Sequence, residues 1–264
     1  MFDLQVVFDA GSGRDDGATG LAQLTLSMLQ EGTRQRDAQQ IAEGFDAVGA
    51  RLATSVRRNK ATLRIRSLSA EQQRNTAVAL LAEMLGQPLF AEDKLQQVKD
   101  QLINVAAQRQ ESAFEKAVDQ LFKHAYANHP YAANDARIAH TIPELTPAVL
   151  KAFHQNALNA RNALITLVGD LSVEHAREIA VQISAALPAG QALPPLQPPS
   201  AFESEIYHLE HPGTQSNLLL AIPGIDIDHP DAPALALANL ILGGPGATSR
   251  LFEALRTQRG LTYS

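Results

Sequence analysis

Five prolines between positions 187 and 200 constrain the fold of this chain more than any other feature. They stand at positions 188, 194, 195, 198 and 199 of the segment LPAGQALPPLQPPS. Proline cannot continue a helix or donate to a sheet ladder, so regular elements are expected to end before this segment and to restart after it. The sequence therefore predicts an interdomain linker at 187–200, between a domain over 1–186 and a second one over 201–264.

Strand and helix patterns are mixed before the linker. Bulky and β-branched residues predict strands over 2–10 and 163–171, and two alternating runs within 51–68, joined at Arg58 and Asn59, predict a hairpin. Ser69 and Ser172 are the predicted N-caps of two helices. Helical spacing of apolar residues predicts helices over 21–29, 37–48, 70–85, 92–110, 113–126, 147–156 and 172–187. The predicted class is α+β, with a mixed β-sheet flanked by helices.

The pattern restarts after the linker. Strands are predicted near 203–210 and 217–222, followed by a helix over 232–242, a glycine-rich turn and a helix from Ser249. This strand-to-helix order resembles that of the first domain. Because the last residues, LTYS, have β-forming character directly after Gly260, we expect the second domain to be incomplete.

Composition excludes several classes of function. The 264 residues carry a formal net charge of -6 and a pI near 5.7, so no basic surplus is present to neutralise nucleic-acid phosphates or anionic lipids. No apolar run approaches the ~20 residues that cross a bilayer, and no targeting signal is visible. The absence of cysteine excludes disulfides, thiolate metal sites and cysteine nucleophiles.

The segment GLAQLTLSMLQEGT at 20–33 resembles the metal-binding helix of the pitrilysin/insulinase family of zinc peptidases. Active members carry H-x-x-E-H between GLA and ML. On that motif the first histidine falls on Gln23, the general-base glutamate on Leu26 and the second histidine on Ser27. Amide and hydroxyl oxygens are poor zinc ligands, and leucine cannot activate water. Hydrolysis by the family's mechanism is therefore expected to be absent, with no metal bound by this chain.

The family's third ligand is a glutamate about seventy-five residues further on. The resemblance places it in VKDQL, on Gln101, with Asp100 as the alternative. Neither choice restores a histidine to the site. Ser27 is not expected to be a nucleophile, because the helix supplies it with no base. His208 and His211 do not predict a replacement metal site, since residues three apart on a strand face opposite sides.

Further landmarks extend the resemblance over essentially the whole chain. They are FDAGSG, AVGARL at 47–52, NHPYA at 128–132, LITLVGDL at 164–171 and SRLFEALRTQRGLTY. In the last of these, the resemblance maps an arginine and a tyrosine of the family onto Arg256 and Tyr263. Family members use this pair opposite the zinc, to bind the substrate backbone and to stabilise the tetrahedral intermediate.

The resemblance also implies partners. In two-subunit bacterial and mitochondrial members, one subunit keeps the zinc and the other is degenerate, which implies a heterodimer acting on peptides or unfolded polypeptides. This chain would supply Arg256 and Tyr263 to its metal-bearing partner. The turn GGPGATS resembles the glycine-rich loop of degenerate subunits, which makes Gly243, Gly244 and Gly246 candidates for substrate contact. Bacterial members of this paired type are often exported, which favours the periplasm.

Two other functions remain open on the sequence alone. One is a structural scaffold, a role that the family's respiratory-complex subunits have taken. The other is an autonomous, self-associating peptide-binding protein. A scaffold needs neither Arg256 nor Tyr263, so retention of the pair favours the heterodimeric peptidase. A neighbouring gene that encodes an intact H-x-x-E-H helix would discriminate these hypotheses.

Overall fold

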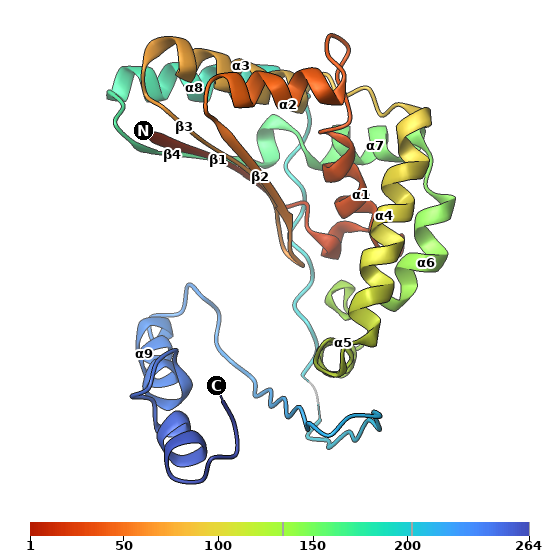
Figure 1. Ribbon diagram of the computed structural model, residues 1–264, viewed down its shortest axis with the longest axis vertical. Coiled ribbons are helices and arrows are strands. Elements are labelled where there is room, and N and C mark those ends of the chain that lie inside the picture. Colours follow the sequence, from red (N-terminus) through yellow and green to blue (C-terminus); the bar gives the residue numbers. More distant parts are fainter. Residues whose placement is uncertain (134, 202, 264) are drawn as a thin grey trace. The chain divides into compact units, whose positions relative to one another are not determined.

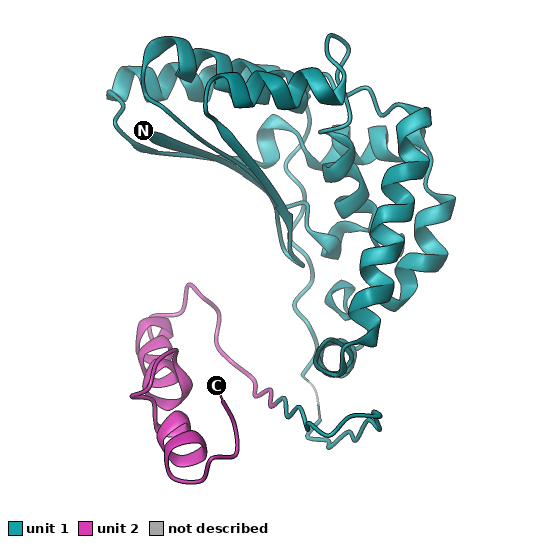
Figure 2. Ribbon diagram, viewed as in Figure 1, with its two compact units in different colours: residues 1–219 teal, residues 220–264 magenta. Residues whose placement is uncertain are grey.

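A computed structural model describes residues 1–133, 135–201 and 203–263. These residues divide into two compact units, Met1–Leu219 and Leu220–Ser264 (Figure 2). The predicted domain boundary at 187–200 lies inside the first unit and remains a prediction. None of the helices in the described part of the chain is long and apolar enough to cross a bilayer.

The described strands form one 4-stranded antiparallel sheet in the first unit, in the order β2-β3-β1-β4. The strands are β1 (Phe2–Phe8), β2 (Arg51–Val56), β3 (Ala61–Ser67) and β4 (Ala163–Gly169). The β2–β3 hairpin and the other two strands, β1 and β4, were predicted, and the α+β class is confirmed. The pairings correct one detail, because every described pair is antiparallel, whereas a mixed sheet was expected.

The α-helices described in the first unit closely follow the predicted ranges, except for α6, which was not predicted (Figure 1). They are α1 (Leu21–Met28), α2 (Ala38–Ala47), α3 (Glu71–Gly86), α4 (Glu92–Glu111), α5 (Ala113–Ala125), α6 (Ile138–Thr141), α7 (Pro147–Ala157) and α8 (Val173–Ala186). Ser172 caps α8, as predicted, by accepting the His175 N–H. Ser69 does not cap α3, because its hydroxyl bonds Asp170 and the amino group of Met1 instead.

The hydrophobic core lies between the sheet and a layer formed by α2, α3 and α8 (Figure 1). Strand alternation explains which side chains enter it, since successive residues point to opposite faces. Phe2, Leu4, Val6 and Phe8 of β1 are each at most 1% exposed. On the opposite face Asp3 accepts hydrogen bonds from Arg64 and Arg66 of the neighbouring strand.

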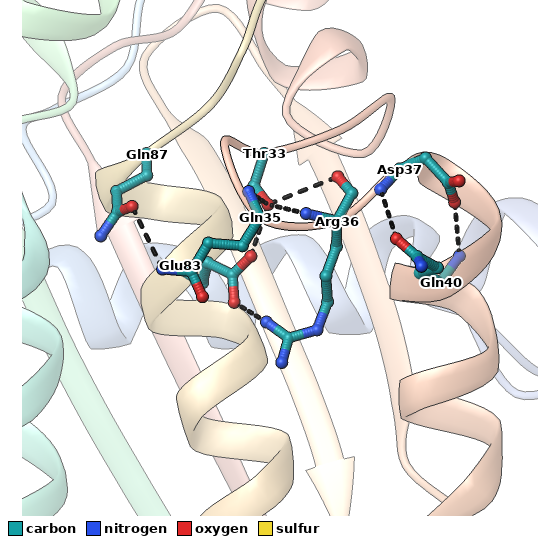
Figure 3. Close-up of polar contacts among 7 residues, drawn as sticks. All are labelled: Thr33, Gln35, Arg36, Asp37, Gln40, Glu83 and Gln87. Atoms are coloured by element: carbon teal, nitrogen blue, oxygen red, sulfur yellow. Dashed lines mark hydrogen bonds and ion pairs between the residues drawn. The ribbon is translucent and has the colours of Figure 1, made fainter.

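A polar cluster joins the α1–α2 loop to α3 (Figure 3). The carboxylate of Glu83 accepts the Thr33 hydroxyl and pairs with the Arg36 guanidinium. Thr33 Oγ1 also accepts the backbone N–H of Arg36 at 3.0 Å. Directly after this loop, Asp37 and Gln40 form a capping box that begins α2. The direction in which the chain leaves α1 is thus fixed by hydrogen bonds as well as by apolar packing.

The second unit contains helix α9 (Ala232–Gly243) and a π-helix, Phe252–Thr257. The strands expected at 203–210 and 217–222 are wrong, since the described residues there are in no strand. A strand needs a second strand to complete its backbone hydrogen bonds, and no described segment pairs with these residues. Their side chains accordingly remain in solvent, with Ile206 99% and Leu218 93% exposed.

The buried carboxylate of Asp15 caps the first turn of α1. It is 2% exposed and accepts the N–H groups of Gly20 and Ala22 at 2.8 and 2.9 Å. Burial raises the pKa of Asp15 from 3.8 to about 6, although the N–H donors of Ala22 and Gly20 oppose the rise. The folded chain therefore retains, up to about pH 6, a proton that the unfolded chain loses near pH 4.

This proton makes stability depend on pH. Because the folded state binds the extra proton, the free energy of unfolding contributed by Asp15 falls as pH rises from about 4 to about 6. Asp15→Asn has no such proton, so its stability relative to the unmodified chain should rise by roughly 2–3 kcal/mol between these values. Urea denaturation of both proteins along this pH range measures the difference. A difference that does not change with pH would contradict the assignment.

The Glu83 cluster gives a second prediction. Glu83→Ala removes the acceptor shared by Thr33, which is 4% exposed, and Arg36. We expect the free energy of unfolding to fall by about 1–3 kcal/mol, because buried donors are left unpaired. The matched control is Glu178→Ala on the exposed surface of α8, with an expected change within about 0.5 kcal/mol. Equal effects of the two substitutions on urea denaturation would show that the cluster contributes nothing.

Candidate functional site

Helix α1 presents the residues that stand at the expected metal positions. Gln23 and Ser27 are half-buried and lie one turn apart, and Leu26 is 1% exposed within the core. Residues three and four apart share a helix face, so the geometry for convergence is kept while the donor atoms are not. An amide, an alkyl group and a hydroxyl do not fit zinc, which takes imidazole, thiolate or carboxylate ligands.

A cavity of about 690 Å³ opens beside this helix. One wall is the start of α1 and the loop before it, with Asp15, Thr19 and Gln23. Facing walls come from the β2–β3 turn, from the second half of α4, from α5 and from the loop around Tyr131. Gln23 is the only predicted metal-position residue that lines this cavity within the described part of the chain.

The predicted third ligand position does not reach the cavity. Asp100 and Gln101 are both exposed on α4 and are not part of the lining. The α4 residues that line the cavity are Leu102, Val105, Ala106 and Arg109. Each residue turns a helix by about 100°, so an error of one position moves a side chain to a different face. Gln101 thus does not line the cavity with Gln23, and the α4 side chains that do line it supply no carboxylate.

Charged and aromatic residues missed by the sequence analysis form the outer part of the cavity. The Arg58 guanidinium lies 3.4 Å from the centre of the Phe122 ring and donates to the Tyr131 carbonyl at 3.2 Å. Burial lowers the pKa of Arg58 and raises that of Asp119, which accepts a bond from Gln110. Apart from Tyr131, within the NHPYA landmark, no motif marked these residues.

A second group of ion pairs also contributes to the cavity lining, through Arg109 and Asp135. Arg109 pairs with Glu115 and Asp135, each at 2.7 Å. Because its charge is already compensated, Arg109 is not a free anion-binding group. Across residues 1–133, 135–201 and 203–263, no three His, Asp or Glu side chains converge where they could hold a metal ion. His208 instead bonds Glu210, and His211 bonds the Glu111 carbonyl.

Arg256 and Tyr263 come together in the second unit. The Arg256 guanidinium carbon lies 5.2 Å from the centre of the Tyr263 ring, within the range of a cation–π contact. Gly260, with a φ of 62°, lets the chain reverse, and its N–H bonds the Arg256 carbonyl. Tyr263 is 83% exposed, so the phenol hydroxyl is presented to solvent.

The glycine turn has a local structural explanation at two of its positions. A Cβ on Gly244 would lie 2.4 Å from a Leu240 methyl carbon, and Gly246 has a φ of 110°. The end of α9 therefore needs Gly244, and the turn that follows needs Gly246. Gly243 meets only a Leu251 side-chain atom, at 3.2 Å. Contact of these glycines with substrate remains a prediction.

The assignment of the third metal-ligand position on α4 can be tested by engineering a zinc site. In a chain carrying Gln23→His and Ser27→His, we expect added Leu102→Glu to give tighter Zn²⁺ binding than added Gln101→Glu. Only the former places a carboxylate on the α4 face that lines the cavity with Gln23. Isothermal titration calorimetry of the two triple variants makes the comparison. Equal or tighter binding by the Gln101→Glu protein would assign the position to Gln101.

Comparison with known proteins covers nearly all of the sequence. Residues 3–136 match the insulinase family, peptidase family M16, and residues 144–264 match the peptidase M16 inactive domain. The uncharacterized zinc protease YmxG of Bacillus subtilis is 23% identical over 245 residues, covering 93% of this chain and 59% of the relative. The non-peptidase homolog YmxG of Helicobacter pylori is 26% identical over 257 residues, covering 96% and 58%.

Solved structures agree on the fold. A peptidase M16 inactive domain from Pseudomonas fluorescens has a TM-score of 0.90 at 40% identity, over 100% of this chain and 64% of that one. A protease from Helicobacter pylori has a TM-score of 0.80 at 18% identity, over 100% and 64%. The periplasmic protease PqqL from Escherichia coli, at 0.67 and 18%, is matched over 75% of this chain and 23% of its own. The last two likenesses show the fold alone.

The chain spans less than two thirds of the length of these relatives. Their names are divided between zinc protease and non-peptidase homolog. The inactive-domain match begins at residue 144, so α1, which has no zinc ligands, lies in the part of the chain that matches the insulinase family. The resemblance inferred from GLAQLTLSMLQEGT is therefore confirmed at the level of the family. Since one family match covers half of the sequence and the second covers most of the rest, the chain belongs to peptidase family M16, the insulinase family.

Proposed function

We propose that this chain is the non-catalytic subunit of a heterodimeric zinc peptidase, in which a metal-bearing homologous subunit cuts peptides or unfolded polypeptides. The observation that carries the proposal is a contrast within the chain. Gln23 and Ser27 replace the family's two histidine ligands, and Leu26 replaces its general-base glutamate. Arg256 and Tyr263 are retained, with the Arg256 guanidinium carbon 5.2 Å from the centre of the Tyr263 ring. A subunit with this combination can assist hydrolysis but cannot supply the zinc.

The two retained side chains have suitable chemistry for an oxyanion. The guanidinium of Arg256 is permanently charged and donates in a fork, and the phenol of Tyr263 donates as a neutral group. Donors held ready before charge develops stabilise a tetrahedral intermediate most effectively. The contact between the Tyr263 ring and Arg256 restricts both side chains, which favours such preorganisation. In this role the pair acts in trans, on substrate held at the partner's zinc.

Gly243, Gly244 and Gly246 are proposed to lie along the bound peptide, where glycine lets another backbone approach closely. The location proposed for the heterodimer is the periplasm. It rests on the paired bacterial members that the sequence resembles, and PqqL, one of the structural neighbours, is described as periplasmic.

The proposed heterodimer can be tested by mixing the two purified subunits. The full chain and a homologous subunit with an intact H-x-x-E-H helix from the same genome should each be inactive alone and should cleave an unfolded peptide together. Tyr263→Phe and Arg256→Ala should each lower kcat by about 100-fold, the effect expected of one lost oxyanion donor. The matched controls are Tyr207→Phe and Arg259→Ala, also exposed, which should leave cleavage unchanged.

Three results would contradict the proposal. Full activity of the Tyr263→Phe and Arg256→Ala double variant would remove the role in trans. Tight binding of extended peptides by this chain alone, without effect on the partner's cleavage, would favour an autonomous peptide-binding protein. A stable complex whose activity is independent of both residues, with no peptide bound by this chain, would favour a scaffold.

A further inference from the structure

The proline-rich segment follows the first unit with a repeat of three residues. Leu187 is buried, and Gly190, Leu193 and Leu196 are half-buried. Pro188 is also half-buried, whereas positions 189, 191–192, 194–195 and 197–200 are exposed. A chain that buries every third residue has the period of a polyproline II helix, which has 3 residues per turn. Prolines favour this conformation because the ring fixes φ.

Hydrogen bonds show the same repeat. Each of the four buried or half-buried residues of the repeat is followed by a residue whose carbonyl accepts a hydrogen bond from another part of the first unit. They are Pro188 from the Ala160 N–H at 3.1 Å, Gln191 from Asn159 Nδ2 at 3.1 Å, Pro194 from Arg14 Nη2 at 2.8 Å and Gln197 from His129 Nε2 at 3.0 Å. A polyproline II helix makes no internal hydrogen bonds, so its carbonyl groups are free for such contacts.

The fit is closest at Gly190. A Cβ there would lie 2.4 Å from Asn159 Cγ, so any larger residue requires the segment to move away. Asn159 is fully buried and cannot yield easily, because its Oδ1 accepts two backbone N–H groups and its Nδ2 also donates to Asn156. One turn further along, Leu193 packs against the core.

The last of these four hydrogen bonds, from His129 to Gln197, connects the segment to the cavity lining. His129 Nδ1 accepts the Tyr131 N–H at 3.1 Å, so Nε2 must carry the proton that bonds the Gln197 carbonyl. Tyr131 lines the cavity, and its carbonyl holds Arg58. One histidine therefore connects the end of the proline-rich segment to a turn at the cavity rim.

We infer that residues 187–197 are not a free linker but a strap, docked in polyproline II form into a groove of the first unit. The groove consists of the Ala160 N–H and the side chains of Arg14, His129 and Asn159. The strap holds the segment up to Gln197 against the first unit and stabilises the 129–131 turn, whose Tyr131 lines the cavity. This inference is independent of the heterodimer proposed above, since every contact lies within Met1–Leu219.

Spin labelling tests the strap directly, because the sequence contains no cysteine. A single nitroxide at Ala192→Cys, on the exposed side between two docked residues, should show restricted motion in the full chain. The same label at Ala201→Cys, beyond the last of the four repeating contacts, should move more freely. Equal, rapid motion at both positions in the otherwise unmodified chain would overturn the inference.

Two further variants separate docking from general stability. Gly190→Ala should release the label at position 192 to the mobility seen at 201, and it should speed hydrogen exchange of the Ala160 N–H. Gly224→Ala is the matched control, since a Cβ at Gly224 meets no atom within 4 Å. If Gly190→Ala does not fold, Leu193→Ser provides the same readout. Unchanged motion and exchange in the variant that folds would show that the groove does not hold the segment.

Discussion

The rest of the first unit depends on how helix α1 is held. Leu21, Leu24 and Leu26 are among the α1 side chains buried in the core, and Asp15 bonds the N–H groups of its first turn. This helix contacts α4, α7 and β2, so it joins the sheet to the helical part of the unit. Its apolar packing needs no metal. Substitution at the three metal positions could therefore remove the chemistry while leaving the fold in place.

Burial of apolar side chains in the core also explains which parts of the fold could be predicted from the sequence. Alternation in β1 and β3 and helical spacing in α3 and α8 reflect burial against one another, which is local information repeated along the sequence. The strands expected at 203–210 and 217–222 failed because a strand depends on a partner that the pattern does not specify. The proline spacing correctly excluded helix and sheet. It did not reveal that carbonyl groups of the segment would bond Arg14, Asn159 and His129.

The candidate site likewise contains residues that the sequence could identify and residues that it could not. The frame around Gln23 identified the α1 positions, because their spacing is fixed by the helix. Gln101 was assigned from the VKDQL context about seventy-five residues further on, with Asp100 as the alternative, and both side chains are exposed on α4. The cluster of Arg58, Phe122 and Asp119 had no motif, since it arises where two elements distant in sequence, the β2–β3 turn and α5, meet. Arg256 and Tyr263 were assigned from a motif contained in one short stretch of sequence, and their role stays a prediction.

The metal content of the full chain tests the central claim most directly. The chain should be purified alone and in complex with the proposed metal-bearing homologue, and zinc should be measured by mass spectrometry after dialysis. The account predicts zinc in the complex in proportion to the partner subunit, with none above background in this chain alone. Zinc retained by the isolated chain in proportion to its own concentration would contradict the assignment of Gln23, Leu26 and Ser27 as a lost metal site.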